Sequence, residues 1–148
     1  MIARILNGYY RLLQVLLTLL MTALIVPVTM QILSRYTGLI PRYIWTEEIA
    51  RFCFIWIVMI GAMIAVRDGT HFDVDVLPKV SAKAEAVLRI FVHIAMLLAS
   101  MVFVVYGYDF AKFGSIQNSE ISGLPMLTIY IAWPLAGLTW LAFLGEKV

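Results

Sequence analysis

Three charged side chains, Glu47, Glu48 and Arg51, stand immediately before a long hydrophobic segment. On a helix, Glu47 lies four positions and Glu48 three positions before Arg51, so both carboxylates can reach the one guanidinium. The uncharged segment that follows, 52–66, has roughly 15 residues and would rise only about 22 Å, whereas a bilayer core is ~30 Å thick. If this segment spans a membrane, the three charges must lie at or just inside one membrane face, where ionisable groups are usually paired and turned toward protein.

The remaining residues that could bind a metal or a cofactor do not make a recognisable site. His71, Asp73 and Asp75 share one polar segment, but three mixed ligands without a second cluster match neither zinc nor non-haem iron spacing, so we interpret the segment as a hydrogen-bonded turn. His93 is the one histidine within a span, and a haem between helices would need a second. Cys53 is the single cysteine, which excludes an intrachain disulfide. We therefore expect no catalytic residue, metal or cofactor in this chain, and no enzyme activity.

The composition indicates an integral membrane protein. Of the 148 residues, 63% are hydrophobic and 14% are charged, whereas soluble domains carry about 25% charged residues. The net charge of +2 is too small, and the basic residues are too scattered, to predict nucleic-acid binding.

The sequence contains four hydrophobic segments, each about as long as a bilayer crossing. They lie at 12–34, 46–66, 88–108 and 124–145, with a polar loop at 67–83. We predict an all-α integral membrane protein in which residues 1–148 form a single domain of four transmembrane helices.

Local signals refine this prediction. The connection 35–44 is short and contains glycine and proline, so the first two helices should be antiparallel neighbours. Pro27 predicts a static kink in the first span. Thr46 is expected to cap the second helix by accepting from backbone amides, and Gly61 with Ala65 forms a small-xxx-small pair that lets another backbone approach closely.

The distribution of basic residues predicts the orientation. Cytoplasmic loops of membrane proteins carry the excess of lysine and arginine. With the N-terminus inside, the cytoplasmic side would hold Arg4, Arg11, Arg67, Lys79, Lys83, Arg89 and Lys147, and the other side Arg35, Arg42, Arg51 and Lys112. Both termini and the 67–83 loop are therefore predicted to be cytoplasmic, and the Glu47/Glu48/Arg51 cluster is predicted at the outer face.

One ordered set of residues on this four-span chain resembles a known family. The set consists of Trp45, Glu47, Glu48, Arg51, Gly61, Arg67, His71 and Asp75. It resembles the small membrane (Q-type) subunit of tripartite ATP-independent periplasmic (TRAP) transporters, with its specific positions confined to 45–75.

The resemblance implies a multi-pass protein of the bacterial inner membrane. Its implied partners are a large TRAP membrane subunit, a periplasmic substrate-binding protein and the phospholipid bilayer. It also implies that the large subunit carries the substrate and sodium sites and moves as an elevator. The small subunit would then be a non-catalytic scaffold for sodium-coupled uptake of an organic acid.

The sequence itself favours a scaffold over a conduit. Isolated transporters need a polar pathway near the membrane midplane, whereas the ionisable residues here gather at the ends of the spans. The Glu47/Glu48/Arg51 cluster is interpreted as an ion-pair lock on the second helix, facing the first helix, the partner or lipid headgroups. Arg51→Ala is then expected to abolish transport or assembly without changing substrate capture by the binding protein.

The sequence favours two other functional classes less. The alternative is a self-sufficient four-helix, proton-coupled multidrug exporter, but an adjacent arginine keeps carboxylates ionised, which opposes proton exchange near neutral pH. A membrane anchor for a redox enzyme would need haem or quinone-site residues, and an absorbance spectrum would reveal them.

Overall fold

The computed structural model describes residues 1–69 and 81–147, so His71, Asp73 and Asp75 lie outside the described residues. Its helices are α1 (Ile2–Thr37), α2 (Ile44–Asp68), α3 (Ala82–Gly114), α4 (Leu127–Tyr130) and α5 (Ala132–Lys147). Four helical stretches are long and apolar enough to cross a membrane: α1, α2, α3 and the α4–α5 stretch Leu127–Glu146. The prediction of an all-α protein with four spans is confirmed, and the orientation of its termini stays a prediction.

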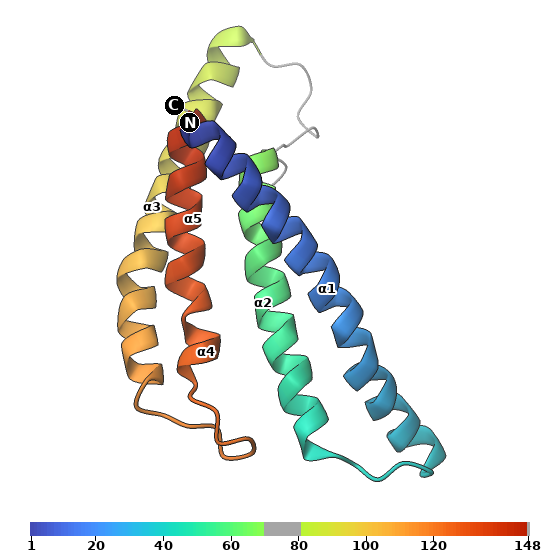
Figure 1. Cartoon of the computed structure of the whole chain (residues 1–148). Coiled ribbons are helices and arrows are strands. Elements are labelled where there is room, and N and C mark those ends of the chain that lie inside the picture. Colours follow the sequence, from blue (N-terminus) through green and yellow to red (C-terminus); the bar gives the residue numbers. More distant parts are fainter. Residues whose placement is uncertain (70–80, 148) are drawn as a thin grey trace.

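The helices pack in the spatial order α1, α2, α5, α3, with α1 against α2 and α3 against α5. The antiparallel pairing of the first two helices is confirmed, and both chain termini lie at one end of the bundle (Figure 1). We call this the terminal end, and we call the opposite end, with the α1–α2 and α3–α4 connections, the loop end. The α1–α2 pair and the α3–α5 pair lie close at the terminal end and spread apart toward the loop end (Figure 1).

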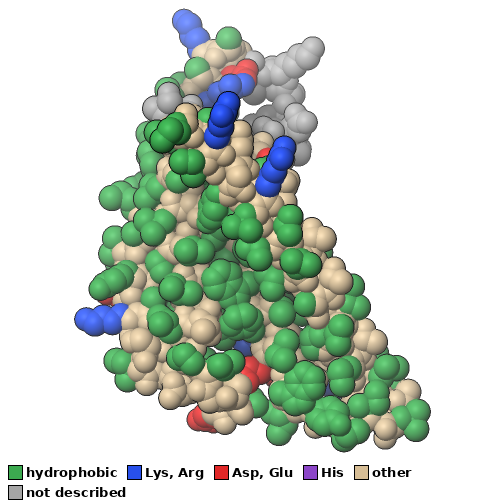
Figure 2. All heavy atoms as spheres, in the orientation of Figure 1, with side chains coloured by type: hydrophobic (Ala, Val, Ile, Leu, Met, Phe, Trp, Pro, Cys, Tyr) green, Lys and Arg blue, Asp and Glu red, His purple; other side chains and the backbone are tan. Residues whose placement is uncertain are grey.

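The core lies between α2 and α5, the two central helices. These helices bury a larger share of their hydrophobic windows than α1 and α3 do. The core side chains are Leu13, Met59, Ile60, Met63, Val66, Met96, Ala132, Ala136, Phe143 and Leu144. Hydrophobic side chains also cover the outer surface between the two ends, and most of the charged side chains lie near the ends themselves (Figure 2). Such a surface suits lipid or a membrane partner, because water would not solvate it favourably.

Close backbone approach occurs between α3 and α5. A Cβ atom at Gly107 would lie 2.7 Å from the backbone nitrogen of Pro134, and one at Gly137 would lie 2.9 Å from that of Val104. At Gly61, where the sequence predicts such an approach, no described heavy atom lies within 4 Å of the Cβ position. Within the described chain no other helix approaches Gly61, because α5 packs on other residues of α2, and close approach of another backbone at Gly61 stays a prediction.

The fourth span is interrupted at Ile131, between α4 and α5. Pro134 explains the interruption, because it lacks an amide hydrogen and its ring clashes with the carbonyl of the residue four positions earlier, Tyr130. The helical stretch begins at Leu127, after the Leu124–Pro125 pair rather than at it. The helices α1 and α3 extend beyond the predicted spans 12–34 and 88–108 at both ends.

The start of α2 differs from the prediction for Thr46. The helix begins at Ile44, its N-cap residue is Tyr43, and no side chain caps it. The buried Thr46 hydroxyl instead donates to the Tyr43 carbonyl at 2.7 Å. Thr46 is therefore a donor within the first turn, and the predicted capping role is wrong because the helix starts earlier than the charged cluster suggests.

Candidate assembly and anchoring sites

The terminal end is held together by Arg67, in the last turn of α2. Its guanidinium donates to the Leu6 carbonyl at 3.1 Å and to the side-chain oxygen of Asn7 in α1. It also lies 3.5 Å from the Glu146 carboxylate in α5, and these two charged side chains are only 15% and 27% exposed. One side chain thus joins three helices, which a planar guanidinium with five donors is suited to do.

Aromatic and hydroxyl groups extend this Arg67 cluster. The guanidinium carbon lies 4.5 Å from the ring centroid of Tyr10 and 5.3 Å from that of Phe143. Tyr10 donates to Asp68 at 2.6 Å. Because cation–π contacts strengthen where water is excluded, the cluster stabilises the junction of α1, α2 and α5.

A second hydroxyl contact lies beside this cluster. The hydroxyl groups of Tyr9 and Thr139 are 2.9 Å apart and join α1 directly to α5. Thr139 also donates to the Leu135 carbonyl within α5, so Tyr9 can serve as the donor to Thr139. Of the contacts at this end, the Arg67–Glu146 ion pair and the Tyr9–Thr139 hydrogen bond join one helix pair to the other, which explains why the two pairs stay close there.

At the loop end, the structure divides the predicted Glu47/Glu48/Arg51 cluster. Arg51 pairs with Glu47 at 3.4 Å, and the two side chains are 62% and 70% exposed. Glu48 instead accepts from the hydroxyl of Ser119, in the α3–α4 connection. No bond joins Glu48 to Arg51 within the described chain, so the three residues do not form one buried lock.

Ser119 forms two backbone hydrogen bonds within the α3–α4 connection, the segment that Glu48 contacts. Its amide donates to the Leu124 carbonyl at 2.8 Å, and its carbonyl accepts from the Gly123 amide at 3.0 Å. Gly123 has φ of 69°, a left-handed conformation that glycine adopts without strain. Glu48 therefore ties α2 to a defined turn, which the sequence analysis missed because no local pattern marks Ser119.

Trp56 links α2 to α4. Its indole nitrogen donates to the Thr128 carbonyl in α4 at 3.1 Å. The carbonyl lies beside the break at Ile131, where helical bonding is incomplete. Because water is absent from the membrane core, a carbonyl oxygen without a hydrogen bond costs free energy there, and the Trp56 indole supplies that bond to Thr128.

The other predicted contact residues occupy separate places. Trp45 is half exposed, with its ring centroid 5.9 Å from that of Tyr43. Gly61 lies along α2 between the two ends, and His71 and Asp75 lie outside the described residues. The described residues hold no group of three potential metal ligands. The role of all eight predicted positions in binding a partner or lipid stays a prediction.

The sequence matches the family model described as "Tripartite ATP-independent periplasmic transporters, DctQ component" over residues 24–148. A protein of Haemophilus influenzae named as a TRAP transporter small permease is 30% identical over 104 residues, which cover 70% of this chain and 65% of the relative. The sialic acid TRAP transporter small permease protein SiaQ of Vibrio cholerae is 27% identical over 130 residues, 87% of this chain and 75% of the relative. The isethionate TRAP transporter permease protein DctMQ of Oleidesulfovibrio alaskensis is 27% identical over 124 residues, which cover 78% of this chain and only 20% of that protein.

Proposed function

The chain belongs to the family of DctQ components of tripartite ATP-independent periplasmic transporters, and on that premise we propose that it is the non-catalytic small permease subunit that scaffolds a large membrane subunit. The observation that carries this proposal is the match to about a fifth of the DctMQ permease. The remaining four fifths of that permease supports a larger membrane partner for the part that this chain resembles.

The internal bonding of the spans supports a scaffold. Thr18 and Thr22 donate to carbonyls of their own helix, and so does the buried Ser100. Bonds of this kind use the hydroxyl proton within the same helix rather than toward another group. The described ion pairs lie near helix ends, whereas a substrate site in a transporter lies near the midplane.

The transport cycle proposed for the assembly follows from the family resemblance. The large subunit would carry the sodium and substrate sites and move as an elevator beside this fixed chain. A periplasmic binding protein would deliver the substrate. Two relatives are named for sialic acid and isethionate, which supports an organic acid as the substrate class.

The proposed location is the bacterial inner membrane, with several spans and with both termini in the cytoplasm. Four apolar helices support the membrane assignment, and the excess of basic residues on one side supports the orientation. The binding protein would then meet the loop end of the bundle.

Reconstitution with each subunit left out in turn tests the proposal. Proteoliposomes with this chain and its large subunit should take up the organic acid when the binding protein and a sodium gradient are present. The large subunit alone should show little uptake, and this chain alone should show none. Full uptake by the large subunit alone would contradict a scaffolding role, and proton-driven drug efflux by this chain alone would favour the exporter.

A further inference from the structure

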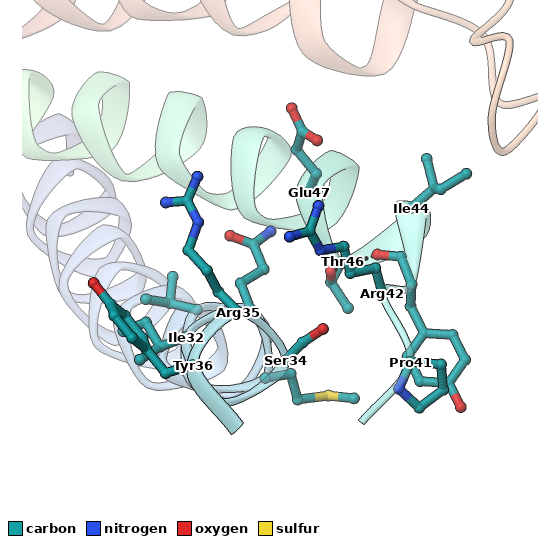
Figure 3. A pocket seen from close by; sticks show the side chains of 13 residues that line it. Ile32, Ser34, Arg35, Tyr36, Pro41, Arg42, Ile44, Thr46 and Glu47 are labelled. Carbon is teal, nitrogen blue, oxygen red and sulfur yellow. Dashed lines mark hydrogen bonds between the residues drawn. The ribbon is translucent and has the colours of Figure 1, made fainter. Parts of the chain in front are cut away.

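A cavity of about 630 Å³ lies at the loop end, between the last turns of α1 and the start of α2 (Figure 3). Its polar lining includes Ser34, Arg35 and Arg42, and its apolar lining includes Val28 and Ile32. The cavity thus has two kinds of wall, one able to bind an anion and one able to contact hydrocarbon.

The two arginines of this cavity carry charge that the chain does not neutralise. Neither Arg35 nor Arg42 forms an ion pair or a side-chain hydrogen bond with any residue that the structure describes. Glu47 also lines the cavity, but its carboxylate is bonded to Arg51. A cation in the last turn of α1 suits the helix dipole, which accounts for Arg35 but not for Arg42 in the following connection.

Further groups of the cavity favour an anion. Figure 3 shows the Arg35 and Arg42 side chains extending toward the same side of the cavity. The Ser34 hydroxyl is buried and has no hydrogen-bond partner among the described residues. The N-cap residue Tyr43 gives α2 no side-chain cap, although Glu47 in the first turn already complements the helix dipole.

The apolar wall identifies the kind of anion. Val28 and Ile32 precede Arg35 by about two turns and one turn of helix, and they are 37% and 52% exposed. They lie nearer than Arg35 to the middle of the apolar helix α1, so in a bilayer they would lie at the depth of acyl chains. A soluble anion would use only the polar wall, but a phospholipid uses both.

We propose that this cavity binds a phospholipid, with Arg35 and Arg42 holding the phosphate oxygens and an acyl chain lying along Val28 and Ile32. Guanidinium groups match phosphate oxygens in charge and geometry. The bound lipid would accept a hydrogen bond from the Ser34 hydroxyl. It would also stabilise the α1–α2 hairpin at the end where the helix pairs spread apart. This lipid site does not depend on the proposed transport function.

Photolabelling of the unaltered protein tests the proposal. The probe is phosphatidylglycerol with a diazirine in one acyl chain, added to the detergent-solubilised complex with the large subunit and to this chain alone. We expect the label in both samples within 28–36, displaced by unlabelled phosphatidylglycerol but not by diacylglycerol or inorganic phosphate. Displacement by diacylglycerol would show that the phosphate group is not recognised, and displacement by inorganic phosphate would favour a soluble anion as the ligand. Loss of label in the complex would mean that protein fills the cavity. Each of these three results would overturn the proposal.

A pair of matched variants tests the arginines directly. Arg35→Gln with Arg42→Gln should weaken binding of the probe by at least about tenfold, because both charged donors to the phosphate are removed. Arg4→Gln with Arg11→Gln removes two arginines from the other half of the same helix and should leave labelling of 28–36 unchanged. Equal labelling by both double variants would contradict the proposal, and if the first variant does not fold, the competition on the unaltered protein decides.

Discussion

At the scale of single residues, Arg67 and Arg51 of α2 differ in what surrounds their guanidinium groups. Arg67 is 15% exposed and contacts α1 and α5, whereas Arg51 is 62% exposed and pairs with Glu47 of its own helix. Removing one partner of a buried pair leaves the other charge uncompensated, while an exposed pair contributes little. Arg67 therefore has the larger structural role, although the sequence analysis assigned the lock to Arg51.

Substituting the two arginines should separate these roles. Arg67→Ala is expected to destabilise the fold by about 1.5–3 kcal/mol, because the Glu146 carboxylate and the Leu6 carbonyl lose their donor. Arg51→Ala should cost no more than about 0.5 kcal/mol. Unfolding of the purified chain in mixed micelles, followed by circular dichroism, measures both.

The outcome for Arg51→Ala also bears on the earlier prediction about transport. If this variant keeps its stability but loses uptake, the role of Arg51 lies in the contact with a partner or lipid. Equal destabilisation by the two substitutions would contradict the difference in burial.

The contact between Glu48 and Ser119 gives a second prediction at this scale. Ser119→Ala removes the hydroxyl that donates to Glu48, so the α3–α4 connection should open more often. Hydrogen exchange of amides in 119–126 is expected to become several-fold faster, and Glu48→Ala should have a similar effect. Glu47→Ala is the matched control and should leave exchange in this segment unchanged, since among the described residues the Glu47 carboxylate bonds only to Arg51. Acceleration by all three substitutions would show that the Glu48–Ser119 bond does not hold the turn.

At the scale of elements, α3 and α5 pack closely because glycines remove side-chain volume where the helices meet. The Gly107 position faces the backbone of Pro134, and the Gly137 position faces Val104. Small residues at such contacts increase van der Waals packing, which is the main force between helices in lipid. The α3–α5 pair is thus a closely packed unit on which α2 packs.

Adding one methyl group at the α3–α5 contact tests this description. Gly107→Ala would place a Cβ 2.7 Å from a backbone atom that cannot move away easily, so the helices must separate. Overpacking of this kind should cost about 1–3 kcal/mol. Gly61→Ala is the control, because nothing in the described chain lies within 4 Å of its Cβ position; a loss of stability from Gly61→Ala equal to that from Gly107→Ala would contradict the assigned packing.

At the scale of the whole molecule, the sequence predicts the number and type of the spans because hydropathy and bilayer thickness constrain them strongly. It does not predict which helices touch. The Arg67 contacts with Asn7 and Glu146 and the Glu48 contact with Ser119 join residues far apart in sequence. Gly61, Gly107 and Gly137 look alike in sequence, and only the packing of whole helices decides which of them receives a neighbouring backbone.

The orientation of the whole molecule gives the last prediction. The segments assigned to the cytoplasm hold seven basic residues and the other segments hold four, which predicts that both termini are cytoplasmic. In a Cys53→Ser background, a cysteine introduced at Gly123 in the α3–α4 connection should react with a membrane-impermeant maleimide in intact spheroplasts. A cysteine introduced at Lys83, at the start of α3, should react only after the membrane is permeabilised. The reverse pattern would place the loop end in the cytoplasm, away from any periplasmic binding protein, and would contradict delivery of substrate to that end.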